Sequence, residues 1–236
     1  MNRAAIGATA SNALVKAIGL AAIALVAGCT TTTVNEHREA SASLSLGDAE
    51  KIVVLGRRHA GHYETEPDFI ECIGQRLANV KTVEVIDEKT FVNSLYPWFE
   101  PRTAPLKLGR LEHMLRDPLL ARRISSLGVR YMIWVDGNTE TTDSSGSVSC
   151  AVAPGAGGCF GFATWDKVSN YEAVIWDIND FSDKGRVRVD AQGSSYLLAI
   201  GAPIPFIARV QGEACEGIGN QLRTFFVPSD ATSKVP

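Results

Sequence analysis

VRYMIWVD, residues 129–136, predicts a β-strand at the point where the periodicity of the chain changes. Gly128 precedes it directly, in the C′ position where helices commonly end. Before this strand, apolar residues recur at helical spacing between short apolar runs, whereas after it they recur at every second position. We therefore expect an α/β fold of the α+β kind, a mixed sheet of about five strands with helices packed on it.

The part of the chain before this strand predicts two short strands, at residues 51–56 and 83–87. The helix between them begins at Thr65 as N-cap, with an acid three residues later and a proline in the first turn. Two further helical segments occupy residues 88–95 and 106–127, and in the second Asp117 supplies an N-cap and Pro118 a first-position proline before residues 119–127. The first strand is a short apolar run ended by Gly56, which predicts that it is buried.

After this strand, the sequence predicts strands at residues 170–177 and 186–191. A polar turn separates them, so we expect an antiparallel hairpin with one solvated face. Residues 201–206 predict an apolar linker, and a last helix follows at residues 207–225. The expected element order is β-α-β-α-α-β-β-β-α.

Residues 1–28 have the composition of a signal peptide. Arg3 and Lys16 are its only charged side chains, and its apolar run at residues 17–27 is too short to span a bilayer. The run ends in LVAGC, in which small residues precede Cys29, and this resembles the lipobox of bacterial lipoproteins. The alternatives are an ordinary signal peptide with Cys29 there by chance, and an uncleaved helix.

The resemblance to lipoproteins implies that Cys29 is the first residue of the mature chain, carries lipid including palmitate, and anchors the protein in a membrane. Because Thr30 and not Asp follows the cysteine, it also implies the outer membrane, with the protein facing the periplasm. Residues 29–47 would then be a flexible tether, residues 48–227 a periplasmic α/β domain, and residues 228–236 a loose tail.

Charge argues against a nucleic-acid partner. The chain has 23 basic and 26 acidic residues, and the leader contains two of the basic ones and no acid, which leaves 21 against 26, or −5. No cluster of Lys and Arg with interleaved aromatic residues occurs. We therefore expect no nucleic acid among the partners.

Four cysteines remain after Cys29, an even number that suits disulfide bonds in an oxidising compartment. Of the three possible pairings we favour Cys150 with Cys159, around a short loop rich in Gly, and Cys72 with Cys215, from the first helix to the last. Free buried thiols are the alternative. A zinc site is disfavoured because the cysteines occur singly, without a paired His.

One loop suggests chemistry. His59, His62 and Glu64 follow the first strand of the domain and are candidate ligands of a metal, as in a metal-dependent periplasmic enzyme, although such a loop is more often a solvated connection. The glycine-rich residues 155–161 lack the Gly-Lys-Ser/Thr of a phosphate-binding loop. Asp136, Asp177 and Asp180 end or follow strands, where a carboxylate commonly makes a turn. We expect no catalytic residue, metal or cofactor.

Two apolar stretches are candidates for contact with a partner. Tyr96, Trp98 and Phe99 lie between prolines, and residues 202–206 read APIPF. Each stretch either fills the core or forms an exposed patch for a partner, and its burial in the structure distinguishes the two.

The order of elements resembles that of a group of periplasmic lipoproteins and domains that includes CsgG, the amino-terminal domain of TolB, and the peptidoglycan-synthase activator lipoproteins. The segments that carry this likeness are Ile52–Leu55, the helix with Phe69 and Leu77, Val83–Asp87, Leu127–Gly137 and Ala173–Ile178. The resemblance implies a mixed sheet with helices packed on it, and work in secretion, assembly or activation by binding and not by catalysis. Unlike CsgG, this sequence shows no obvious pair of amphipathic pore strands.

We therefore expect a non-catalytic assembly, secretion or accessory component of the cell envelope, anchored by lipid, that binds an envelope protein or associates with itself. The alternatives are the metal-dependent enzyme and a ligand-binding lipoprotein. The latter would have a deep apolar pocket behind the loop that follows the first strand of the domain.

Overall fold

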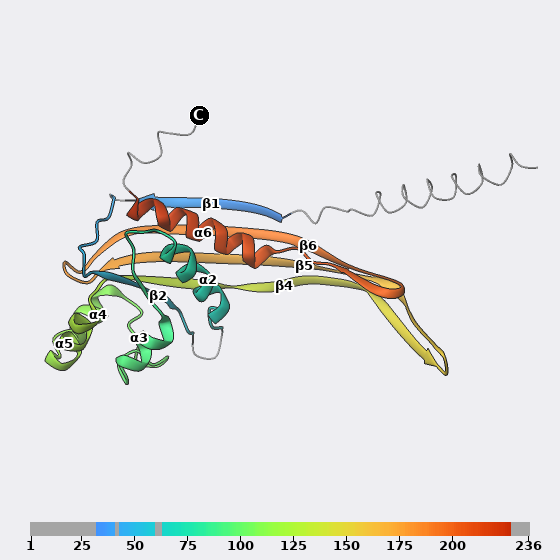
Figure 1. Ribbon diagram of the computed structural model, residues 1–236, viewed down its shortest axis with the longest axis horizontal. Coiled ribbons are helices and arrows are strands. Elements are labelled where there is room, and N and C mark those ends of the chain that lie inside the picture. Colours follow the sequence, from blue (N-terminus) through green and yellow to red (C-terminus); the bar gives the residue numbers. More distant parts are fainter. Residues whose placement is uncertain (1–31, 41–42, 60–62, 228–236) are drawn as a thin grey trace, which may run out of the picture. The chain divides into compact units, whose positions relative to one another are not determined.

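A computed structural model describes residues 32–40, 43–59 and 63–227. These form a mixed six-stranded sheet with the strand order β1-β6-β5-β4-β2-β3 (Figure 1). The strands are β1 (Thr32–Ala40), β2 (Lys51–Gly56), β3 (Val85–Ile86), β4 (Val129–Ala153), β5 (Ala156–Asp177) and β6 (Ser182–Phe206). The helices are α2 (Pro67–Ala78), α3 (Glu88–Ser94), α4 (Leu108–Met114), α5 (Pro118–Leu127) and α6 (Val210–Phe226).

The two faces of the sheet are covered by different helices. Helices α2 and α6 pack on one face, where Phe69, Ile73 and Leu222 join the buried side chains of the strands. Helices α3, α4 and α5 pack on the other face, through residues such as Phe91 and Leu120. Strand β2 pairs in parallel with both β3 and β4, and its residues 52–55 are buried because helices lie on both faces there.

Several local features of the structure agree with signals in the sequence. Asp117 caps α5, since its side chain accepts a hydrogen bond from the backbone N–H of Leu119 at 2.8 Å. Gly128 ends the same helix with φ at 71°, in the left-handed region. Thr65, however, does not cap α2. The N-cap is Glu66, and the Thr65 hydroxyl donates instead to the carbonyl of Val135 at 3.3 Å.

The expectation of about five strands in the order β-α-β-α-α-β-β-β-α is wrong. The sheet has six strands, and the element order is β-β-α-β-α-α-α-β-β-β-α. The extra strand is β1, which lies within the predicted tether and pairs antiparallel with β6 along its whole length. Its sequence, TTVNEHREA, is mostly polar, and of its described side chains only Val34 is apolar and packs against the core, so no alternation of apolar and polar residues marks it as a strand.

The last three strands are much longer than expected. Strands β4, β5 and β6 have 25, 22 and 25 residues, so residues 137–169 form a long hairpin in which only Pro154 and Gly155 lie outside the two strands. Residues 201–206, predicted to be a linker, are part of β6. Ser and Gly are frequent in these segments, and their low strand propensity conceals the strands in the sequence.

Several expectations fall on residues that the structure does not describe. The leader, Cys29, His62 and the tail at residues 228–236 all lie outside the described ranges. Within the described ranges, none of the helices has both the length and the apolar character that a membrane crossing requires.

Candidate functional site

Three strands continue beyond the helices and form a β-arm, which we define as residues 144–165 and 194–206 (Figure 1). None of these residues is Asp, Glu, Lys, Arg or His, whereas 21% of the whole chain is charged. The residues at its base are charged again, with Asp143, Asp166 and Lys167 on β4 and β5. A long uncharged surface next to an ordinary charged body is the most unusual feature of the described residues.

One side of the arm carries a ladder of apolar side chains. Phe160 pairs with Ile200, Phe162 with Leu198, and Thr164 with Tyr196 across β5 and β6. Because side chains alternate along a strand, these residues share one face. Phe160 and Ile200 are 67% and 70% exposed, and the rings of Phe162 and Tyr196 stack at 6.2 Å. We call Phe160, Phe162, Tyr196, Leu198 and Ile200 the aromatic face.

The other side of the arm is partly covered by the chain itself. The backbone N–H of Ala208 donates to the hydroxyl of Ser195 at 3.0 Å, so the chain has turned back over β6 within 13 residues. Gly201 has φ at 85°, which permits a tight reversal there. Ser195 and Ala199 are buried as a result. The aromatic face is therefore the open side of the arm.

A disulfide joins the two strands near the tip of the arm. Cys150 and Cys159 are cross-strand neighbours of β4 and β5, and their sulfurs are bonded. This is one of the two pairings expected from the sequence. The bridge fixes the register of a hairpin that has few large side chains to hold it.

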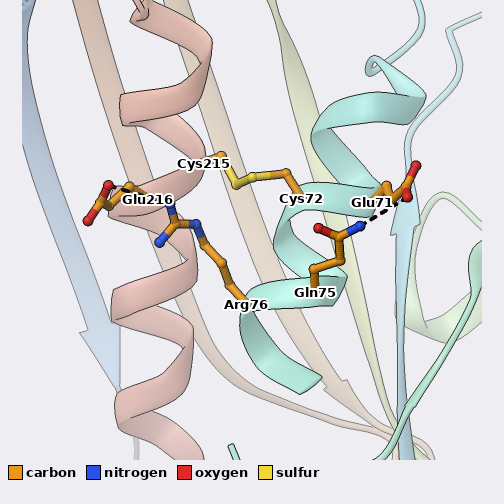
Figure 2. Close-up of a disulfide and its surroundings, with 6 residues drawn as sticks. All are labelled: Glu71, Cys72, Gln75, Arg76, Cys215 and Glu216. Atoms are coloured by element: carbon orange, nitrogen blue, oxygen red, sulfur yellow. Dashed lines mark hydrogen bonds and ion pairs between the residues drawn. A yellow bond between two sulfur atoms is a disulfide. The ribbon is translucent and has the colours of Figure 1, made fainter. Parts of the chain in front are cut away.

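The second expected disulfide, Cys72 to Cys215, joins α2 to α6 (Figure 2). Arg76 of α2 reaches Glu216 of α6 at 3.4 Å beside it. The two helices that cover one face of the sheet are thus linked covalently as well as by packing.

A partly buried hydrogen-bond network links the start of α2 to β4 and β5 near the base of the arm. The carboxylate of Glu66 accepts hydrogen bonds from the Thr139 backbone N–H at 2.8 Å and the Tyr171 hydroxyl at 2.9 Å. The Thr139 hydroxyl lies 2.7 Å from that of Ser169. Burial, and then the hydrogen bond to Glu66, raise the pKa of the Tyr171 hydroxyl, so it stays a donor. Strands β4 and β5 are therefore tied to the start of α2 next to the base of the arm.

The candidate metal ligands do not come together in the described residues. His59 Nε2 lies 3.0 Å from Asp136 Oδ1, and the Tyr63 hydroxyl donates to the same oxygen at 2.5 Å. Glu64 pairs with Arg58 at 2.8 Å. Among the residues that the structure describes, no three His, Cys, Asp or Glu side chains form a group that could hold a metal ion.

The loop after β2 has a buried cation, Arg57, that is not apparent from the sequence. Arg57 is packed against Trp134 and Trp176, with its guanidinium carbon 4.1 Å and 5.1 Å from the ring centres, and it donates to the carbonyl of Pro105 at 2.5 Å. Burial lowers its pKa to about 10. No local signal marks Arg57, because its partners are remote in sequence.

The hollow beside Arg57 is the place where a ligand-binding lipoprotein would have its pocket. It is lined by Leu55, Glu88 and Phe99 among others, and its volume is about 20 Å³. This is room for about one water molecule. The hollow therefore gives no support to a deep apolar ligand pocket behind this loop.

The other residues singled out in the sequence lie in different parts of the structure and do not form one site. In the aromatic loop, Phe99 is 4% exposed and packs edge-on against Phe91, whereas Tyr96 is 64% exposed, so the loop is not a single patch. Asp177 is fully buried and pairs with Arg130, and Asp180 forms a turn with Ser182. Residues 202–205 are exposed and belong to the arm.

Comparison with known proteins gives little. No protein-family model matches the chain, and no curated protein matches it. Among solved structures, this chain is similar to the PelC dodecamer from Paraburkholderia phytofirmans. The match covers 84% of this chain and 100% of the PelC chain, at 12% identity and a TM-score of 0.36. A match to a variant of the same protein covers 82% of this chain and 97% of the variant's chain, at 13% identity and a TM-score of 0.35.

Proposed function

We propose that this chain is an outer-membrane lipoprotein that faces the periplasm and acts as a non-catalytic assembly, secretion or accessory component of the cell envelope. It acts by binding and not by catalysis, and the arm is the element that binds. The observation that carries the proposal is the exposed aromatic face on an arm without charges. Exposed apolar clusters of this kind are rare on isolated soluble domains and are typical of binding surfaces.

The location of the protein is inferred from two features. The leader ends in LVAGC, which supplies Cys29 for lipid attachment. The other four cysteines form two disulfides, which persist in oxidising compartments such as the periplasm. A lipid chain on Cys29 together with further acylation would hold the protein more firmly than a single chain does.

The strand β1 changes the expected form of the anchor. Only Thr30 and Thr31 lie between Cys29 and the first residue of β1, Thr32. Three residue steps span at most about 10 Å. A lipid on Cys29 would therefore hold the sheet close to the membrane, and not at the end of the flexible tether that residues 29–47 were expected to form.

Two measurements test this function with the full chain. Labelling of cells with a palmitate analogue should mark the wild-type protein and not a Cys29→Ser variant, and fractionation should place the labelled protein in the outer membrane. In a strain that lacks the natural gene, the wild-type chain should restore the missing phenotype. An arm variant, Phe160→Ser with Phe162→Ser, should fail to do so while remaining folded and labelled.

A matched control is Leu119→Ser, which alters an exposed side chain on α5. This variant should restore the phenotype. Palmitate label on the Cys29→Ser variant would contradict the anchor, and full activity of the arm variant would contradict the role of the arm.

A further inference from the structure

We propose that the aromatic face of the arm lies on the surface of a lipid bilayer, as a second membrane contact beside the lipid on Cys29. This rests on the lipid anchor of the proposed function and names the partner of the arm. Three features of the molecule support lipid contact: the order of side chains along the arm, the place where the chain enters the sheet, and the unpaired edge of β4.

Side chains change in character from the base of the arm to its tip. Asp143, Asp166 and Lys167 form a charged base. Tyr196, with a polar end to its ring, comes next along the aromatic face, opposite Thr164. Phe162 and Leu198, and then Phe160 and Ile200, follow toward the tip. The charged side chains thus lie only at the base, where they stay in water, and the apolar side chains lie along the part of the arm that would contact the lipid surface.

The complete absence of charge favours lipid over a protein partner. Protein interfaces have a polar rim in which charged residues and hydrogen bonds surround the apolar centre. The arm has no charged residue on either side over the whole of residues 144–165 and 194–206. A charged side chain is costly in lipid and tolerated at a protein interface, so its exclusion from an entire arm is explained by lipid contact.

The entry point of the chain brings the anchor to the same place. Thr32, the first residue of β1, pairs with Gly193 of β6, and the arm begins at the next residue of β6, Ser194. Cys29 is three residues before Thr32. Cys29 would therefore lie within about 10 Å of Thr32, the neighbour of the residue that precedes the arm on β6.

The arm is suited to lie along the surface and not to cross the bilayer by itself. Strand β2 pairs with β4 only as far as Val135, so in the described residues the outer edge of β4 has no strand beside it along the arm. Unpaired backbone groups are not tolerated in the hydrocarbon region. On β4, the residues opposite the ladder are Ser145, Ser147 and Ser149, whose hydroxyls suit the headgroup level.

Site-specific photo-crosslinking in living cells distinguishes lipid from protein. The full chain, with its own leader and Cys29, is produced with p-benzoylphenylalanine in place of Phe162, which is 48% exposed. A control carries the same group in place of Leu119 on α5, which is 44% exposed. After irradiation, adducts are identified by electrophoresis and by the mass of the crosslinked peptide.

The expected result is a phospholipid adduct at Phe162, at least several-fold more abundant than at Leu119. A dominant crosslink between two copies of the chain, or to another protein, would overturn the lipid proposal and leave the contact function intact. Equal lipid adducts at both positions, or none at Phe162, would also overturn it. Palmitate labelling of the same samples tests the anchor separately, since loss of that label contradicts the proposed function itself.

Discussion

At the scale of single residues, Gly137 is a position where only glycine fits the sheet. Its φ is 133°, and a Cβ there would lie 1.9 Å from the carbonyl oxygen of Asn170 on β5. We expect Gly137→Ala to lower the free energy of unfolding by about 2–3 kcal/mol, because the backbone is strained and the strands must separate. The midpoint of urea unfolding measures this. Gly109→Ala on α4, where a Cβ meets nothing, should instead raise stability by about 0.5–1 kcal/mol. Equal effects of the two changes would contradict this account.

The hydroxyl of Tyr63 gives a second prediction at this scale, on pH dependence. Burial, and then the hydrogen bond to Asp136, raise its pKa to about 12. A group whose pKa is raised by folding stabilises the fold below its unfolded pKa, about 10, and this contribution is lost as the pH rises toward 12. We expect wild type to be more stable than Tyr63→Phe at pH 8, and the difference to shrink between pH 10 and 12. Denaturant unfolding of both proteins across this range measures it, and a constant difference would contradict the assignment.

At the scale of elements, the two disulfides should contribute unequally. Cys72–Cys215 closes a sequence separation of 143 residues, and Cys150–Cys159 one of 9. In the chain-entropy model these are worth about 5 and about 2.5 kcal/mol respectively. We expect the paired change Cys72→Ala with Cys215→Ala to lower the melting temperature more than Cys150→Ala with Cys159→Ala does. Thermal unfolding followed by circular dichroism measures the two shifts. The reverse order would show that the tip of the arm, and not the helix pair, limits stability.

The elements also show how far the sequence predicts the structure. The cap at Asp117, the end of α5 at Gly128 and the buried strand β2 have strong local signals, and both cysteine pairings follow from position along the chain. The arm and β1 have no such signals. A strand is recognised by one buried face, and the arm residues are mostly exposed, while β1 is mostly polar. The burial of Arg57 depends on Trp134 and Trp176, which only the fold brings to it.

At the scale of the whole molecule, the short connection from Cys29 to β1 is what would hold the arm against the membrane. Insertion of a 12-residue Gly/Ser segment between Thr31 and Thr32 adds a mean reach of about 20 Å. The arm would then be at a lower effective concentration at the lipid surface. We expect the lipid adduct of p-benzoylphenylalanine at Phe162 to fall several-fold, with palmitate labelling at Cys29 unchanged. The same segment added after Pro236 is the control, and should leave the adduct as it is. If the protein with the added segment gave the same amount of lipid adduct, the affinity of the arm for lipid would not depend on its distance from Cys29, and the short connection would have no role.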